Sequence, residues 1–223
     1  CKGLCFHKRI LFCIIDTRHI WIDRMEKEGD ISSNMNKELL KIVIIGPEST
    51  GKSTLCEELA QYYDAPWCPE FAREYLLTYG TEYQYEDLLT IAKGQLAMED
   101  EYAILAEKNW GNQKKQAAEN PLLFIDTDMY VLKVWSEFVF NKCHQWIIDQ
   151  IVERKYDLYL LCHTDIPWEK DELREYPDLE TREKLFHMYK DILINQSVPW
   201  ANISGTDAER LQKAIKAIDA IIH

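Results

Sequence analysis

The chain has 223 residues, of which 47% are hydrophobic and 29% are charged, so it can bury one substantial core but is short for two. Its formal net charge of −12 argues against nucleic acid as a partner, because proteins that follow a phosphate backbone present clustered Lys and Arg. A small anionic ligand would therefore need a locally positive pocket.

The cysteines and the hydropathy pattern indicate where in the cell the protein is expected. The seven cysteines are scattered and form no Cys-x-x-Cys pair, which favours reduced thiols in a cytoplasmic protein. No apolar run approaches the roughly 20 residues that a membrane-spanning helix requires, so we expect no membrane association. The sequence leaves the oligomeric state open.

Residues 1–34 surround two short apolar clusters with mixed charges and end in a polar stretch. They contain no pattern that suggests chemistry. Met35 stands just before the first clear element. We therefore expect a catalytic domain over residues 35–223 and an N-terminal appendage of no assigned function over residues 1–34.

The predicted elements then alternate between strands and helices. Residues 41–45 are a β-branched run suited to a strand buried on both faces, and residues 51–63 carry apolar side chains at helical spacing. Strands separated by helices favour a parallel sheet covered on both faces, and hence an α/β three-layer sandwich. The later elements are a short strand at 67–68, a helix over 82–110, and strands over 122–126, 156–162 and 200–204.

The residues from Gly46 to Ser53 form the pattern Gly-x-x-x-x-Gly-Lys-Ser between the first strand and the first helix. Backbone N–H groups of such a loop curl around phosphate oxygens, and the next helix presents its positive N-terminal end. Lys52 would reach the β- and γ-phosphates of ATP, and Ser53 would ligate Mg²⁺. The sequence therefore predicts a P-loop NTPase fold. Its predicted nucleotide-binding residues are Gly46, Glu48, Ser49, Thr50, Gly51, Lys52, Ser53 and Thr54.

This loop does not identify a class, because GTPases, motor ATPases and small-molecule kinases share it. The chain has no Asn-Lys-x-Asp guanine-reading motif and is short for a large oligomeric ATPase. What remains is a small-molecule kinase with an acceptor pocket and an arginine-bearing lid.

Several separated motifs recur in the order of a known family. After the loop they are Trp67-Cys-Pro-Glu-Phe-Ala-Arg-Glu-Tyr75, Phe124-Ile-Asp-Thr-Asp128, Lys133-Val-Trp-Ser-Glu137, Tyr156-Asp-Leu-Tyr-Leu-Leu-Cys162, Asp165-Ile-Pro-Trp168 and Ser204-Gly205. Over about residues 40 to 205 the chain resembles the ribosylnicotinamide kinase domain of NadR-type proteins. The His-x-Gly-His signature of the adenylyltransferase domain is absent. The resemblance therefore implies the kinase half, which converts ATP and N-ribosylnicotinamide to ADP and nicotinamide mononucleotide in NAD salvage.

Phosphoryl transfer needs Mg²⁺ ligation, a carboxylate near the acceptor hydroxyl and cations over the migrating group. Asp126 ends an apolar strand and is the candidate for organising Mg²⁺ together with Ser53. Asp128 would share that task or contact the acceptor. Alternatively, one of these carboxylates only caps the following helix.

On the acceptor side, Glu70 follows the predicted second strand, where related small-molecule kinases carry a carboxylate that contacts the acceptor hydroxyl. It is the candidate general base or acceptor anchor. Arg73 lies on the same face if the segment is helical and is a second substrate contact, although a simple surface ion pair between the two is the alternative. Trp67 or Tyr75 would either stack on the nicotinamide ring or pack in the core.

Residues 165–186 are dense in charge and interrupted by prolines, which favours a lid. Arg174, and after it Arg182, would move over the phosphates on closure and help to exclude water. The alternative is a solvated helical hairpin whose charges only keep the protein soluble. The predicted catalytic residues are thus Lys52, Glu70, Asp126 and Arg174.

The leading hypothesis is a cytoplasmic, ATP-dependent kinase that phosphorylates N-ribosylnicotinamide. The nearest alternative is a P-loop kinase for another nucleoside or small metabolite. A different class is a non-catalytic ATP-binding regulatory module, which would use the nucleotide to set its shape.

Overall fold

The structure is a computed structural model and describes residues 37–112 and 119–222. The predicted appendage over residues 1–34 and the domain start at Met35 lie outside the described residues. In the described part of the chain, no helix combines the length and the apolar character needed to cross a membrane.

Parallel strands form one sheet in the order β2-β3-β1-β4-β5. The central strand β1 pairs with β3 on one side and with β4 on the other, while β2 and β5 form the edges. The strands are β1 Leu40–Ile45, β2 Trp67–Cys68, β3 Leu122–Asp126, β4 Leu158–Cys162 and β5 Trp200–Ile203. Each coincides with a predicted strand to within two residues.

Helices connect the strands, because a parallel neighbour can be reached only by a crossover. The predicted helices over 51–63 and 82–110 are α1 and α3, and the others were not delimited from the sequence. The helices are α1 Lys52–Tyr63, α2 Phe71–Tyr79, α3 Tyr85–Asn112, α4 Met129–Phe140, α5 Gln145–Glu153, α6 Leu179–Ile194 and α7 Asp207–Ile222.

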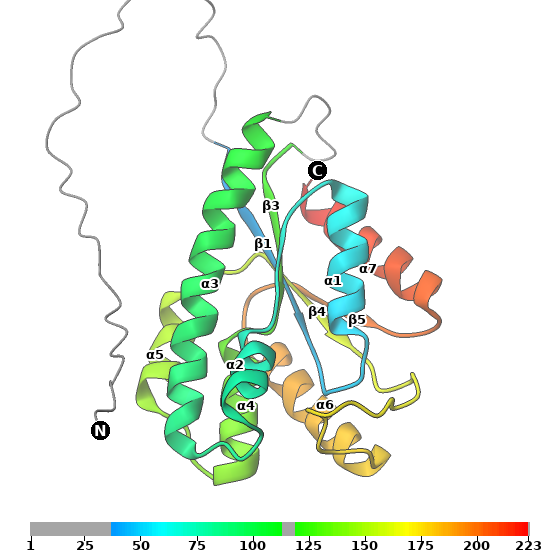
Figure 1. Cartoon of the computed structure of the whole chain (residues 1–223). Coiled ribbons are helices and arrows are strands. Elements are labelled where there is room, and N and C mark those ends of the chain that lie inside the picture. Colours follow the sequence, from blue (N-terminus) through cyan, green and yellow to red (C-terminus); the bar gives the residue numbers. More distant parts are fainter. Residues whose placement is uncertain (1–36, 113–118, 223) are drawn as a thin grey trace, which may run out of the picture. The chain divides into compact units, whose positions relative to one another are not determined.

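Alternate side chains of β1 enter two different cores, since successive residues of a strand point to opposite faces. Ile42 and Ile44 pack in the cluster formed with α1 and α7. Val43 and Ile45 pack in the cluster formed with α3, α4 and α6, which lie on the other side of the sheet (Figure 1). The prediction of an α/β three-layer sandwich is confirmed.

Candidate active site

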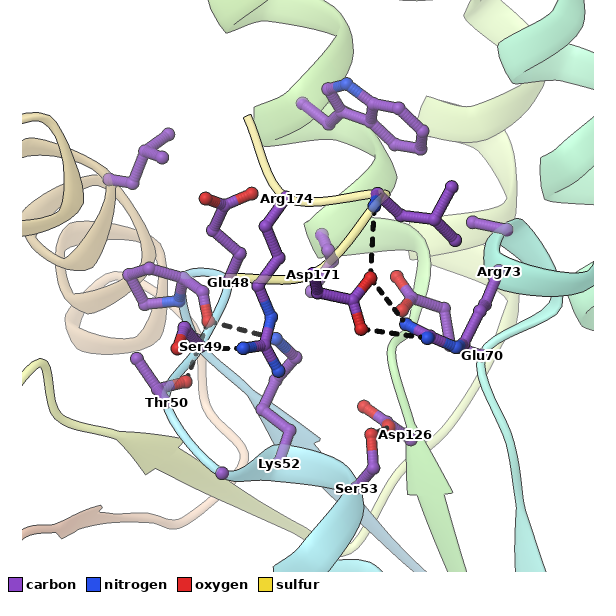
Figure 2. A pocket seen from close by; sticks show the side chains of 18 of the residues that line it. Glu48, Ser49, Thr50, Lys52, Ser53, Glu70, Arg73, Asp126, Asp171 and Arg174 are labelled. Atoms are coloured by element: carbon purple, nitrogen blue, oxygen red, sulfur yellow. Dashed lines mark hydrogen bonds and ion pairs between the residues drawn. The ribbon is translucent and has the colours of Figure 1, made fainter. Parts of the chain in front are cut away.

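A cavity of about 550 Å³ lies at the carboxyl ends of β1, β2 and β3 (Figure 2), where open α/β sheets bind their ligands. Its walls are the phosphate loop, the start of α2, part of α4 and residues 171–176 between β4 and α6. Asp128, Tyr75 and Arg182 are predicted site residues that do not line it. The predicted residues that line it are Gly46, Glu48, Ser49, Thr50, Gly51, Lys52, Ser53, Thr54, Trp67, Glu70, Arg73, Asp126 and Arg174.

The phosphate loop follows a path that its residue types dictate. Gly46 has a φ of 146°, and a Cβ on it would lie 2.7 Å from the carbonyl oxygen of Cys162, so no other residue fits. Ser49 and Gly51 also have positive φ values, 53° and 73°. Helix α1 then begins at Lys52 without a side-chain cap, which leaves its first N–H groups for an anion.

Two buried arginines hold this loop from outside. Arg182 donates to the carbonyl oxygen of Ser49 at 2.9 Å, and Arg210 donates to that of Thr50 at 2.9 Å. Because the C=O and N–H of a trans peptide point in opposite directions, these bonds turn the N–H groups of Thr50 and Gly51 away from the arginines. The loop's donors are thereby aimed before any ligand arrives.

The prediction that Arg182 belongs to a lid is wrong. Residues 179–186 form the first turns of α6, and Arg182 is only 3% exposed there. Sequence reasoning missed Arg210, which is 160 residues from the carbonyl that it holds. No local pattern could have revealed this pairing.

At the end of β3, Asp126 faces the first turn of α1. The hydroxyl of Ser53 donates to Asp126 Oδ2 at 2.5 Å, and Lys52 donates to the carbonyl oxygen of Pro47 at 3.0 Å. Burial raises the pKa of Asp126, and the charge of Lys52 and the Ser53 hydrogen bond oppose that rise.

These two oxygen ligands suit Mg²⁺, which prefers hard donors and completes its shell with water and phosphate oxygens. Within the described ranges, no group of three or more His, Cys, Asp or Glu side chains could hold a metal ion. Ser53 and Asp126 therefore fit a metal ion that arrives with a nucleotide.

The turn after Asp126 is strained. Thr127 has a φ of 79°, a conformation that costs a β-branched residue about 1–3 kcal/mol, and it is buried. This turn sends Asp126 toward α1 and Asp128 into the interior. Such strain persists only where the surrounding structure fixes it, and here it separates two carboxylates that are close in sequence.

Asp128 caps helix α4, and this position corrects the prediction that it contacts the acceptor. Its Oδ1 accepts from the N–H groups of Tyr130 and Val131, and its Oδ2 accepts from the hydroxyl of Tyr159 at 2.9 Å. The side chain is buried away from the cavity. Burial raises its pKa to about 7, against the lowering effect of these hydrogen bonds.

Glu70 is the residue before α2, but its side chain makes no capping hydrogen bond and instead lines the cavity, on the side of Asp126 (Figure 2). Burial raises the pKa of Glu70, and the negative charge of Asp126 raises it further, while Lys52 and Arg73 lower it. A carboxylate in this position can anchor a hydroxyl or accept its proton.

Arg73 is paired with Asp171 rather than with Glu70. Its two Nη atoms donate to the two carboxylate oxygens of Asp171 at 3.3 and 2.9 Å, and Asp171 also accepts from the N–H of Leu173. Sequence reasoning missed Asp171, which lies 98 residues from its partner. This pair joins α2 to the segment between β4 and α6.

Trp67 lines the cavity and also packs against the core beside α1, and its stacking on a nicotinamide ring stays a prediction. Tyr75 is different: its hydroxyl donates to Asp87 at 2.7 Å, and it is not part of the cavity wall. The remaining aromatic wall comes from Trp135, Phe138, Tyr176 and Tyr189.

Residues 165–178, which we call the lid segment, lead from β4 to α6 without regular secondary structure. Arg174 extends from it toward Ser49 and Lys52 (Figure 2). Its Nη1 donates to the hydroxyl of Ser49 at 3.2 Å and to the carbonyl oxygen of Glu169 at 2.6 Å. A cation thus lies beside Lys52 at the phosphate end of the cavity.

Comparison with known proteins agrees with this geometry. Residues 41–210 match a family model described as an AAA domain. The chain is similar to the trifunctional NAD biosynthesis/regulator protein NadR of Escherichia coli (strain K12), with 27% identity over 170 residues. That alignment covers 74% of this chain but only 38% of the relative.

Two solved structures of NadR proteins are also similar. One is in complex with NR and the other with NAD and AMP-PNP, and their TM-scores are 0.64 and 0.59 at 21% and 22% identity. Each alignment covers 82% of this chain and 49% of the solved chain. At this identity the likeness establishes the fold.

The family match runs from β1 to the first turn of α7 and contains the whole cavity wall. The resemblance to NadR-type proteins that the motifs predicted is confirmed. The chain therefore belongs to the AAA-domain family of P-loop proteins, with NadR proteins among its homologues.

Proposed function

We propose that this protein transfers the γ-phosphoryl group of ATP to a hydroxyl of N-ribosylnicotinamide and releases ADP and nicotinamide mononucleotide. The observation that carries the proposal is that one cavity joins the phosphate loop to the carboxylate of Glu70. A donor and an acceptor can therefore meet in it without crossing solvent.

The donor half consists of the phosphate loop, Lys52, Ser53 and Asp126. The loop N–H groups and Lys52 would hold the triphosphate and neutralise its charge. Ser53 and Asp126 would hold Mg²⁺, which neutralises charge on the phosphate oxygens when it is bound. Arg174 would add a second cation over the migrating group.

Glu70 is the centre of the acceptor half. Its raised pKa means that it takes up a proton more readily than an ordinary glutamate, which suits a group that must accept the proton of a hydroxyl. Arg73 and Trp67 would border the acceptor. Asp128 is left out of this half because it caps α4.

The charge of the acceptor region favours a cationic substrate. The carboxylates of Glu70 and Glu175 line the cavity, whereas Arg73 and Asp171 neutralise each other in an ion pair. A positively charged ring would be attracted to this surface, whereas an acceptor that already carries a phosphate would be repelled. The ring of N-ribosylnicotinamide has this positive charge.

The comparisons support the proposal from another side. The names of the solved NadR structures place NR in one and the ATP analogue AMP-PNP in the other, and the curated relative is a NAD biosynthesis protein. The chain spans 38% of that relative, so only the phosphorylating activity is proposed. We assign it to the cytoplasm, because Cys56, Cys68, Cys143 and Cys162 are free thiols.

The test is to incubate the protein with ATP, Mg²⁺ and a panel of nucleosides and to quantify ADP and phosphorylated product. We expect N-ribosylnicotinamide to give the largest kcat/KM, and its uncharged dihydro form to give a value at least about 10-fold lower. Phosphorylation of a different nucleoside alone would favour the kinase alternative. ATP binding without acceptor-dependent ADP release would favour the regulatory module.

We also propose that residues 35–223 are sufficient for this activity. A chain that starts at Met35 should bind ATP and phosphorylate the acceptor at the rate of the full chain. Loss of ATP binding in the shortened chain would contradict the proposed boundary.

A further inference from the structure

Glu48 belongs to the phosphate loop, yet its carboxylate is occupied by the lid segment. The indole Nε1 of Trp168 donates to Oε1 at 3.1 Å. The backbone N–H of Tyr176 donates to the same oxygen at 2.7 Å, and that of Glu175 donates to Oε2 at 2.9 Å. Both carboxylate oxygens are therefore used by residues that lie more than a hundred positions later in the chain.

This arrangement resolves an electrostatic conflict. A carboxylate in a loop that binds a polyanion repels its own ligand unless other donors stabilise its charge and direct it away from that ligand. The three donors from the lid segment do so, because hydrogen bonds to an ionised acceptor are the strong ones. The lid segment thus supplies donors to both oxygens of the Glu48 carboxylate.

The two backbone N–H groups that Glu48 holds belong to the residues directly after Arg174. Because Glu48 accepts from these two N–H groups, it fixes the backbone next to Arg174 and hence the position of the Arg174 Cα atom. Ser49, the next loop residue, accepts from the N–H of Glu169 at 3.0 Å and from Arg174 itself at 3.2 Å. The phosphate loop thus fixes both the backbone and the guanidinium of Arg174.

Other contacts of the lid segment lead elsewhere. Asp171 pairs with Arg73 of α2, and Glu175 Oε2 accepts from the hydroxyl of Tyr83 at 3.2 Å. These contacts tie the segment to α2 and to the residue Tyr83, which precedes α3. The start of the segment is joined to the phosphate loop by Arg182, which donates to the carbonyl oxygens of both Ser49 and Ile166. The part that carries Arg174 is joined to the loop by Glu48 and Ser49.

We propose that Glu48 is a positioning residue that clasps the lid segment onto the phosphate loop and thereby holds Arg174 beside Lys52. Glu48 stays a predicted nucleotide-binding residue of the loop, and this role is that of its side chain. The catalytic consequence rests on the proposed kinase function, whereas the clasp itself is a property of the unliganded protein.

The activity test uses Glu48→Gln in the full chain. The amide keeps the size of the side chain but replaces one acceptor oxygen with a donor, which opposes an N–H of the lid segment. We expect kcat to fall about 10- to 100-fold, the effect of losing a charged hydrogen bond, while the Kd for ATP changes less than about 3-fold. ADP formed per acceptor phosphorylated should rise, because an open lid admits water.

Glu172→Gln is the matched control, because Glu172 is an exposed carboxylate of the same segment and the charge change is the same. Its kcat and its ratio of ADP to product should equal those of the unchanged protein. Glu48→Asp keeps the charge on a shorter side chain and should fall between Glu48→Gln and the unchanged protein.

A second readout needs no activity. Trypsin cleaves after Lys170 and Arg174, so the cleavage rate in the unliganded protein reports how firmly the segment is held. We expect Glu48→Gln to be cleaved at least about 5-fold faster than Glu172→Gln, at an unchanged melting temperature. Equal cleavage of the two variants, or a loss of ATP affinity that matches the loss of kcat, would overturn the clasp. If the unchanged protein does not phosphorylate N-ribosylnicotinamide, the proposed function fails and the cleavage comparison still decides the clasp.

Discussion

Ser53 and Asp126 are 73 residues apart in the chain and are joined by a 2.5 Å hydrogen bond across the floor of the cavity. The contact exists because β1 and β3 are parallel neighbours, so the loop after one strand faces the end of the other. It places a hydroxyl and a carboxylate where a metal ion bound to a triphosphate would lie.

Replacing Asp126 by Asn should separate catalysis from stability. We expect kcat to fall at least about 100-fold, because the charge that would hold Mg²⁺ is lost. The melting temperature should stay the same or rise, since the buried carboxylate has a raised pKa and its charged form is costly. Steady-state rates across a Mg²⁺ titration and thermal unfolding measure both. Full activity of the variant at low Mg²⁺ would exclude Asp126 as the metal ligand.

Glu70→Gln should change the pH dependence of the reaction. A general base must lose its proton to act, and the pKa of Glu70 is raised above the ordinary 4.5 by burial and by Asp126. The kcat of the unchanged protein should therefore rise with pH through that raised pKa. The variant should be about 100-fold slower and should lack this acidic limb. An identical pH profile in the two proteins would mean that another group accepts the proton.

Asp128 gives a prediction for stability. Its pKa is about 7 in the folded protein and 3.8 when unperturbed, so the folded state retains the proton to higher pH. The free energy of unfolding should therefore fall as pH rises from about 4 to about 7, by at most roughly 4 kcal/mol from this group.

The Asp128→Asn variant should lack this decrease, and its amide oxygen can still cap α4. Urea unfolding at pH 5 and pH 8 tests the difference. We expect the two proteins to be similar at pH 5 and the variant to be the more stable at pH 8. Parallel pH curves for the two proteins would be inconsistent with a buried, neutral Asp128.

Gly46→Ala should disable ATP binding through a backbone contact. The added Cβ would meet the carbonyl oxygen of Cys162 at 2.7 Å on a residue with a φ of 146°. We expect a loss of stability of about 1–3 kcal/mol and no ATP binding by calorimetry. Gly80→Ala is the control, because Gly80 also has a positive φ, 99°, but a Cβ there meets nothing within 4 Å. Equal ATP affinity in both variants would show that the contact with Cys162 does not disable ATP binding.

The sequence predicted those features that depend on neighbouring residues. The strand over residues 41–45 and the loop from Gly46 to Ser53 were found because a β-branched run and a spaced glycine-lysine pattern are local. The bounds of β4 were less accurate: the apolar run begins at Tyr156 but the strand begins at Leu158, because Asp157 turns its carboxylate back to accept from the N–H of Lys41.

Long-range contacts of the site could not be predicted in this way. Glu48 accepts from backbone N–H groups that every residue except proline possesses, so its partners carry no signature. The pairing of Arg73 with Asp171 depends on the path of the lid segment. For Asp128, a local pattern gave a wrong expectation. Its spacing from Asp126 fits a shared site, but the positive φ of Thr127 directs the two carboxylates to different places.

Arg182 and Arg210, which donate to carbonyl oxygens of the phosphate loop, are not part of the loop motif. Both come from the second half of the chain, on α6 and α7. If the eight residues of the motif were placed between a strand and a helix of another protein, the glycines and the lysine would be present. The arginines that orient the peptide planes would be missing. A fragment that ended after β4 would keep every residue of the motif but would lack both arginines. In this protein, the orientation of the phosphate-binding N–H groups therefore depends on the whole domain and not on the eight-residue motif alone.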